Sequence, residues 1–113
     1  MGLLWVRLDC AMPSNPKILA LIEAKRFKAA FGYLCALTYA GQHGTDGFIP
    51  ASALPFIHMT RADANHCADA GLFEVVPGGW DINDWHEFQM SNSETQARKQ
   101  RARDAALARW HPK

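Results

Sequence analysis

The sequence predicts one small α+β domain, mainly α-helical, followed by a basic helical tail. Its 113 residues fit a single domain that can bury a substantial core. Hydrophobic residues make up 49% and charged residues 20% of the chain, a balance typical of globular proteins. Helix-like periodicity dominates the chain, and strand-like alternation is confined to short runs.

The N-terminal part is expected to form a strand and two helices. Residues 3–9 alternate between apolar and polar side chains, which predicts a short half-buried strand. Asn15 is a good N-cap and Pro16 suits a first helical position, so a helix should run from there to about Lys25. Residues 27–42 predict a second helix that is apolar on most sides, which is typical of a central buried helix.

A loop and a very short strand lead to the third predicted helix. Residues 41–47 are rich in glycine and polar residues, as in a loop, and residues 48–49 allow a strand of only two or three residues. Residues 51–58 predict a short helix that Ser52 can cap, with Pro55 tolerated in the first turn.

A fourth helix and a hairpin are expected next. Thr60 opens the helix, Asp63 gives a weak capping box, and Gly71 ends it. Two strand-like runs over 72–76 and 80–84 are joined by a three-residue Pro-Gly-Gly loop.

The order of elements over residues 48–84 is that of a winged helix-turn-helix with a two-stranded wing. A strand, a helix, a tight turn, a helix and a hairpin follow one another. We therefore expect residues 1–90 to form a winged helix-turn-helix domain and residues 91–113 a basic helical tail, opened by a capping box of Ser93 and Gln96.

The fourth helix carries the first candidate DNA-binding residues. Helical periodicity turns these side chains outward: Arg61, Asn65, His66 and Asp69. Arg61 can read guanine and Asn65 can read adenine by bidentate hydrogen bonds. Asp63 and Asp69 oppose phosphate binding, so the alternative is an ordinary solvated helix on a scaffold used for protein contacts.

The tail carries the second candidate set: Arg98, Lys99, Arg101, Arg103 and Arg109. Residues 98–113 hold six Lys and Arg against one Asp, a net charge of +5, whereas residues 1–97 carry a net charge of −4. The tail lacks the wide apolar face of a membrane-surface helix, so phosphate contact is favoured. The alternatives are a solubilising tail and a homodimer contact through Leu107 and Trp110.

No motif indicates catalysis, a metal or a cofactor. The chain has no Cys-x-x-Cys or His-x-x-x-His pair, no glycine-rich phosphate loop and no Gly-x-Ser-x-Gly motif. A nucleophile built from Cys10 with His43 or His86 has no local support. Cys35 and Cys67 are expected to be small core residues.

Three of the four tryptophans lie in strand-like runs. Trp5, Trp80 and Trp85 alternate with polar residues and are expected in the core, although any of them could stack a base.

Three widely spaced cysteines, with no signal peptide or membrane-spanning run, favour a reducing cytoplasm and no membrane partner.

Several stretches together resemble small phage and prophage DNA-binding proteins: WVRLD at 5–9, NPK at 15–17, GTDGFIP at 44–50, AGLF at 70–73, GWDINDWHEFQ at 79–89 and AALARW at 105–110. They are similar to the N-terminal winged-helix domain of phage replisome-organiser or replication-initiation proteins. The resemblance implies binding of duplex DNA at a phage origin or operator, in the cytoplasm of a bacterial host. It places the binding residues in the fourth helix and in the tail.

We therefore expect a non-enzymatic DNA-binding protein of phage or prophage origin that acts in replication initiation or transcriptional control. The alternative is an adaptor that uses the winged-helix scaffold to bind a host factor, a replication protein or a partner subunit.

Overall fold

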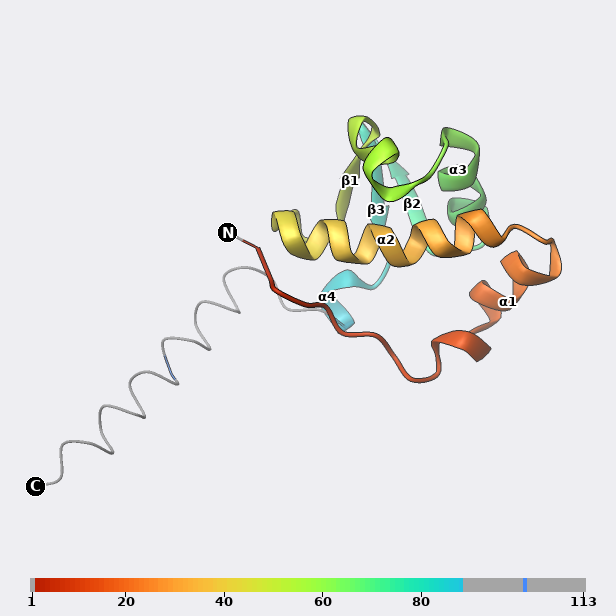
Figure 1. Ribbon diagram of the computed structural model, residues 1–113, viewed down its shortest axis with the longest axis horizontal. Helices are drawn as coiled ribbons and strands as arrows, with labels where there is room; N and C mark the ends of the chain where they lie inside the picture. Colours follow the sequence, from red (N-terminus) through yellow and green to blue (C-terminus); the bar gives the residue numbers. More distant parts are fainter. Residues whose placement is uncertain (1, 89–100, 102–113) are drawn as a thin grey trace, which may run out of the picture.

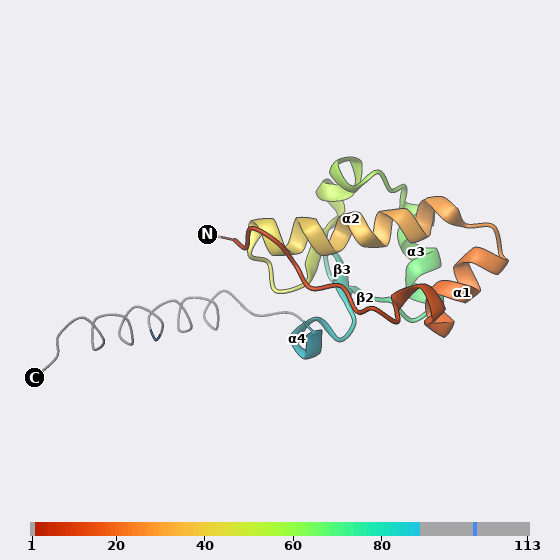
Figure 2. The same ribbon diagram turned by 60° about the horizontal axis from the view of Figure 1, so that its bottom comes forward.

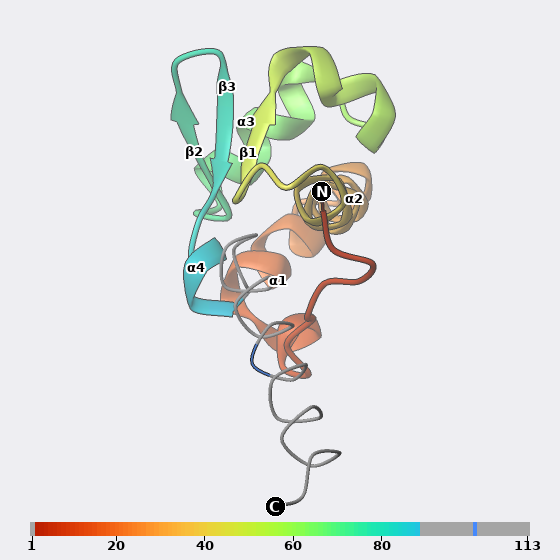
Figure 3. The same ribbon diagram turned by 90° about the vertical axis from the view of Figure 1, so that its left-hand side faces the viewer.

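The long helix α2 (Phe27–His43) is the central element of the structure, a computed structural model that describes residues 2–88 and residue 101. The sheet, η2 and α3 lie on one side of α2, and α1 and the N-terminal segment lie on the other (Figure 1). The view along α2 gives the same arrangement (Figure 3). Four α-helices and a three-stranded antiparallel sheet lie within the described residues, which confirms the predicted α+β class.

The N-terminal segment is not the predicted strand. Leu4 is 97% exposed and Trp5 is 82% exposed, and the segment runs beside α2 rather than beside a strand (Figure 2). The backbone N–H of Leu3 donates to the carbonyl of Gly41, and a side chain at Gly41 would collide with Val6. The alternation was misleading because a strand needs a partner with unpaired backbone groups, and a helix uses its own groups internally.

Helix α1 (Pro16–Glu23) begins as predicted. It follows a short 3₁₀ turn, η1 (Met12–Ser14), and the Asn15 Oδ1 accepts a hydrogen bond from the Lys17 backbone N–H at 2.9 Å. The helix ends two residues earlier than expected, and Lys25 then adopts a left-handed conformation with φ of 59°. This conformation turns the chain into α2.

Helix α2 is central, but it is not buried on all sides. Its buried face is built mainly from small residues, with Leu37 as the largest: Ala29, Gly32, Ala36, Leu37, Ala40 and Gly41. Phe27 and Phe31 are 58% and 56% exposed. Small residues let neighbouring elements approach closely, and the large aromatic residues remain on the outer face.

The segment from β1 to α3 follows the predicted order. Strand β1 (Phe48–Pro50) leads into η2 (Ala51–Ile57), which is a 3₁₀ helix, and the side chain of Ser52 does not cap it. Pro55 lies inside this turn and has no N–H to donate, which disfavours regular α-helical pairing. Helix α3 (Arg61–Asp69) opens with the full capping box of Thr60 and Asp63, as predicted.

The sheet is closed by a hairpin whose loop is shorter than predicted. Strands β2 (Phe73–Val76) and β3 (Gly79–Ile82) pair antiparallel, and the strand order is β1-β3-β2. Val76 pairs with Gly79, so the loop contains only Pro77 and Gly78. Gly79 belongs to the strand because its bare Cα fits against the Ile49 carbonyl of β1. The short helix α4 (Trp85–Phe88) follows.

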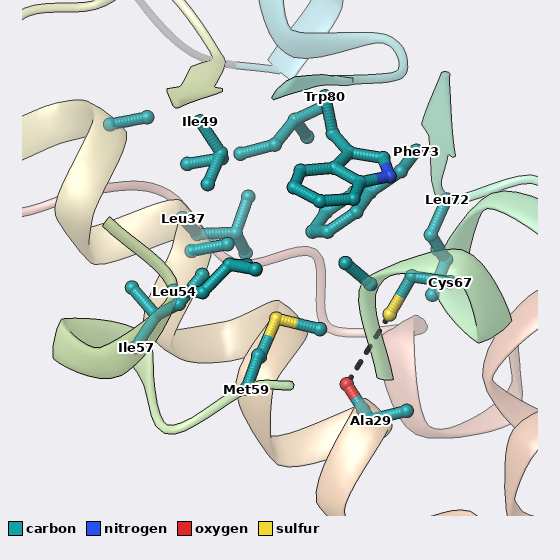
Figure 4. Close-up of a cluster of buried hydrophobic side chains, with 14 of the residues drawn as sticks. Ala29, Leu37, Ile49, Leu54, Ile57, Met59, Cys67, Leu72, Phe73 and Trp80 are labelled. Atoms are coloured by element: carbon teal, nitrogen blue, oxygen red, sulfur yellow. Dashed lines mark hydrogen bonds between the residues drawn. The ribbon is translucent and has the colours of Figure 1, made fainter. Parts of the chain in front are cut away.

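The core lies between α2, α3 and the sheet. Trp80 and Phe73 lie side by side over Cys67 and Leu72 (Figure 4), and Trp80 and Cys67 are fully buried. The Cys67 thiol donates to the Ala29 carbonyl at 3.4 Å, which joins α3 to α2. The core position predicted for Cys67 is confirmed, whereas Cys35 is only half-buried.

The predicted tail helix falls almost entirely outside the described residues. Of residues 91–113, the structure describes only Arg101, which is helical and exposed.

Candidate nucleic-acid interface

Two of the predicted DNA-binding side chains are brought together over Trp80. This tryptophan comes from the middle strand β3 and is 2% exposed. Its Nε1 donates to the Asn65 Oδ1 at 3.3 Å, and the Arg61 guanidinium carbon lies 5.5 Å from the ring centroid. Arg61 and Asn65 are one helical turn apart, so one indole can hold both side chains.

The hydrogen bond from Trp80 fixes the orientation of the Asn65 amide. An indole N–H is a donor only, so the atom that faces it must be the amide oxygen. The Asn65 NH2 group therefore points away from this bond. Arg61 offers five further donors and no acceptor.

His66 lies on another face of α3. It lines a shallow depression between α1 and α3, together with Arg26 and Asp69. Adjacent helical residues differ by about 100° in direction, so His66 cannot share the position of Asn65. The structure thus separates His66 from the pair above Trp80.

Asp63 is one of the two acidic residues of α3 that oppose phosphate binding, and its carboxylate interacts with neighbouring groups of the fold. The Asp63 carboxylate accepts from the Thr60 backbone N–H at 2.8 Å and lies 3.6 Å from the Lys28 ammonium. Burial raises the pKa of Asp63, but the hydrogen bonds from Thr60 and the charge of Lys28 outweigh it, so the pKa is lowered. Its negative charge is compensated within the fold.

The structure adds a group of basic residues that sequence reasoning missed. Lys25, Arg26 and Lys28 are exposed around the exposed Phe27 at the turn between α1 and α2, and we name residues 25–28 the basic corner. Lys28 reaches Asp63, and Arg26 shares the depression with His66, so the corner lies beside α3. The signal in the sequence is the run Lys-Arg-Phe-Lys at residues 25–28, which spans the boundary between two predicted helices.

The tail candidates Arg98, Lys99, Arg103 and Arg109 lie outside the described residues, and the described Arg101 is exposed. They stay predictions from charge.

Two of the residues that could form a cysteine–histidine nucleophile, Cys10 and His43, have different surroundings. Cys10 is exposed, and the His43 ring lies 4.4 Å from the Tyr39 ring, centroid to centroid. Among residues 2–88 and 101, no group of three or more His, Cys, Asp or Glu side chains is placed to hold a metal ion.

The outer face of α2 is a second notable surface. Five large apolar side chains on α2 and on the two segments that flank it, the N-terminal segment and η2, are exposed: Leu4, Trp5, Phe27, Phe31 and Phe56. A groove of about 390 Å³ runs between α2 and η2 and is lined in part by Tyr39 and Phe56. We name this surface the aromatic face.

Among the helices of residues 2–88 and 101, none combines the length and the apolar character of a membrane-spanning helix. Comparisons with protein-family models, curated proteins and solved structures gave no match to this chain.

Proposed function

We propose that this is a non-enzymatic protein that binds duplex DNA through α3. The observation that carries the proposal is the pair of exposed side chains, Arg61 and Asn65, held over the buried indole of Trp80. Side chains that are already ordered lose less conformational entropy when they bind, and both can hydrogen-bond base edges in a major groove.

The arrangement around α3 supports a winged helix-turn-helix mode of binding. Element η2, the short turn at residues 58–60 and α3 form the helical motif, and the β2–β3 hairpin follows as the wing. With α3 in the groove, the basic corner beside it can contact phosphates. The basic tail supplies further phosphate contacts, and the resemblance to phage proteins suggests replication initiation or transcriptional control in a bacterial cytoplasm.

The test is a salt titration of binding to fluorescently labelled random duplex DNA. The logarithm of affinity should fall steeply with the logarithm of salt concentration, and Arg26→Ala should reduce the slope by about 0.9 if Arg26 makes one phosphate contact. Arg7→Ala is the matched control, because it removes the same charge from the N-terminal segment across α2 from α3. An absence of DNA binding at low salt would refute the proposal.

The aromatic face favours a second candidate function, an adaptor for a host or replication protein or a homodimer. Exposed apolar patches of this kind often mark protein interfaces. Here Phe31→Ser should abolish concentration-dependent association in sedimentation experiments and leave DNA binding unchanged. A monomer at every concentration would remove the homodimer from consideration.

A further inference from the structure

We propose that Trp80 determines the base preference of α3 by holding Asn65 as a hydrogen-bond donor, so that the Arg61–Asn65 pair favours guanine over adenine. The inference rests on the proposed DNA-binding function and adds the class of base that the site selects.

The orientation of Asn65 follows from the chemistry of the indole. The Trp80 N–H cannot accept a hydrogen bond, and the ring is buried in the sheet, so its natural partner is the Asn65 oxygen at 3.3 Å. A flipped amide would set the NH2 group against the indole N–H and leave a buried donor without a partner. The bond thus holds the oxygen inward and the NH2 group toward an incoming ligand.

An asparagine held in this way is poorly suited to adenine. Bidentate reading of adenine uses the amide oxygen to accept from N6 and the NH2 group to donate to N7. In this structure the oxygen is directed to Trp80, so the NH2 group is the part offered at the surface. The adenine contact that the sequence suggested for Asn65 would require this oxygen to accept a second hydrogen bond in addition to the one from Trp80.

Guanine matches what the pair presents. In the major groove guanine offers two acceptors, N7 and O6, and no donor. The Arg61 guanidinium carries donors only, and its contact with the Trp80 face leaves the edges of its N–H groups available. The Arg61 guanidinium and the Asn65 NH2 group are donors one helical turn apart, so they should favour guanine at one or both of the bases they reach.

Phosphate oxygens are also acceptors, and the experiment separates the two. A phosphate contact by Arg61 and Asn65 would give affinity without base preference. A guanine contact gives a preference that depends on which atom Asn65 presents.

The experiment is selection from a duplex DNA library with a randomised centre, followed by affinity measurements on the enriched sequences with guanine or adenine at the selected positions. The full chain should enrich guanine. Trp80→Phe keeps an apolar ring but removes the N–H, so Asn65 can rotate, and the guanine-to-adenine preference at one position should fall by about tenfold.

Asn65→Asp provides a second variant that leaves the core untouched. It keeps an oxygen for Trp80 but replaces the outward donor with an acceptor, so guanine enrichment at the same position should disappear. Trp85→Phe is the matched control, because it removes a buried indole N–H away from α3 and should leave the preference unchanged.

Each result of these experiments either supports or overturns the inferred preference for guanine. Enrichment of adenine by the full chain, or DNA binding without base preference, overturns the inference and leaves the proposed function in place. An unchanged guanine preference in Asn65→Asp also overturns it, even if Trp80→Phe does not fold. An absence of any DNA binding refutes the proposed function and, with it, this inference.

Discussion

Three tryptophans with similar sequence surroundings have different environments. Trp80 and Trp85 are buried as predicted, whereas Trp5 is exposed. Trp80 lies on the middle strand and pairs with Ile49 on one side and Val75 on the other. Alternation along a chain indicates a possible strand but does not show whether a neighbouring strand exists, so the same pattern misplaced Trp5.

Arg61 is predicted to contact DNA, and in the structure its guanidinium lies over the Trp80 ring. Arg61→Ala should weaken binding to a selected site more than binding to random DNA, by roughly 1–3 kcal/mol if Arg61 contacts guanine. Fluorescence anisotropy on both DNAs measures the difference. An equal loss on both would make Arg61 a phosphate contact, and no loss on either would place α3 outside the interface.

Asp63 is expected to couple stability to pH. Its folded pKa is below the usual value of 3.8, so the ionised carboxylate stabilises the fold above that pH, and this stabilisation is lost as pH falls through the folded pKa. Asp63→Ala should lower the free energy of unfolding by ~1 kcal/mol at neutral pH, through loss of the capping box. Urea unfolding should show the difference shrinking in acid.

Asp69→Ala is the control for that prediction. Asp69 is exposed in the last turn of α3, where a negative charge is unfavourable to the helix dipole. Its removal should be neutral or slightly stabilising. A similar loss of stability in both variants would indicate a general charge effect rather than the capping box.

At the scale of elements, local chemistry predicted the starts of helices better than their type or packing. The Asn15-Pro16 start and the Thr60–Asp63 capping box were visible in sequence because each uses residues only a few positions apart. The 3₁₀ form of η2 was not predicted. The Arg61–Asn65–Trp80 cluster was not predictable either, because Trp80 is 15 residues from Asn65 and the contact depends on the register of β3.

Gly32 shows how α2 accommodates the turn before α3. A Cβ at Gly32 would overlap the Cγ and Sδ atoms of the Met59 side chain. Gly32→Ala should therefore destabilise the fold by about 1–3 kcal/mol, despite the better helix propensity of alanine. Thermal unfolding measures the loss, and the double variant with Met59→Ala should be less destabilised than the two single variants predict. Stabilisation by Gly32→Ala alone would contradict this packing.

Across the full chain, the excess of positive charge and the hydrophobic core lie in different parts of the sequence. Every residue of the buried cluster within the described region lies between Ile18 and Trp85, whereas the positive excess lies in residues 98–113. Composition showed this division of charge directly. It could not show the basic corner, because three cations near the turn between α1 and α2 add little to the overall charge.

Removal of residues 94–113 should leave a folded domain that binds DNA weakly. The deletion removes six Lys and Arg and two acidic residues, a net charge of +4, and it keeps every residue of the buried cluster found within the described part of the chain. The thermal transition should change little, and each lost phosphate contact should flatten the salt dependence by about 0.9. Unchanged affinity and slope would make the tail a solubility or assembly element, and unfolding would make it part of the core.

The Cys67 thiol is hydrogen-bonded to Ala29 in the core, so the rate at which it is alkylated depends on how often α3 separates from α2. Burial raises the pKa of the Cys67 thiol to about 12, so almost no reactive thiolate is present at neutral pH while α2 and α3 stay packed. Cys10 precedes α1 in the sequence and is exposed, so we expect it to react without any opening of the fold. The ratio of alkylation rates at Cys67 and Cys10, followed by mass spectrometry, therefore reports how often the helix that carries Arg61 and Asn65 separates from its support.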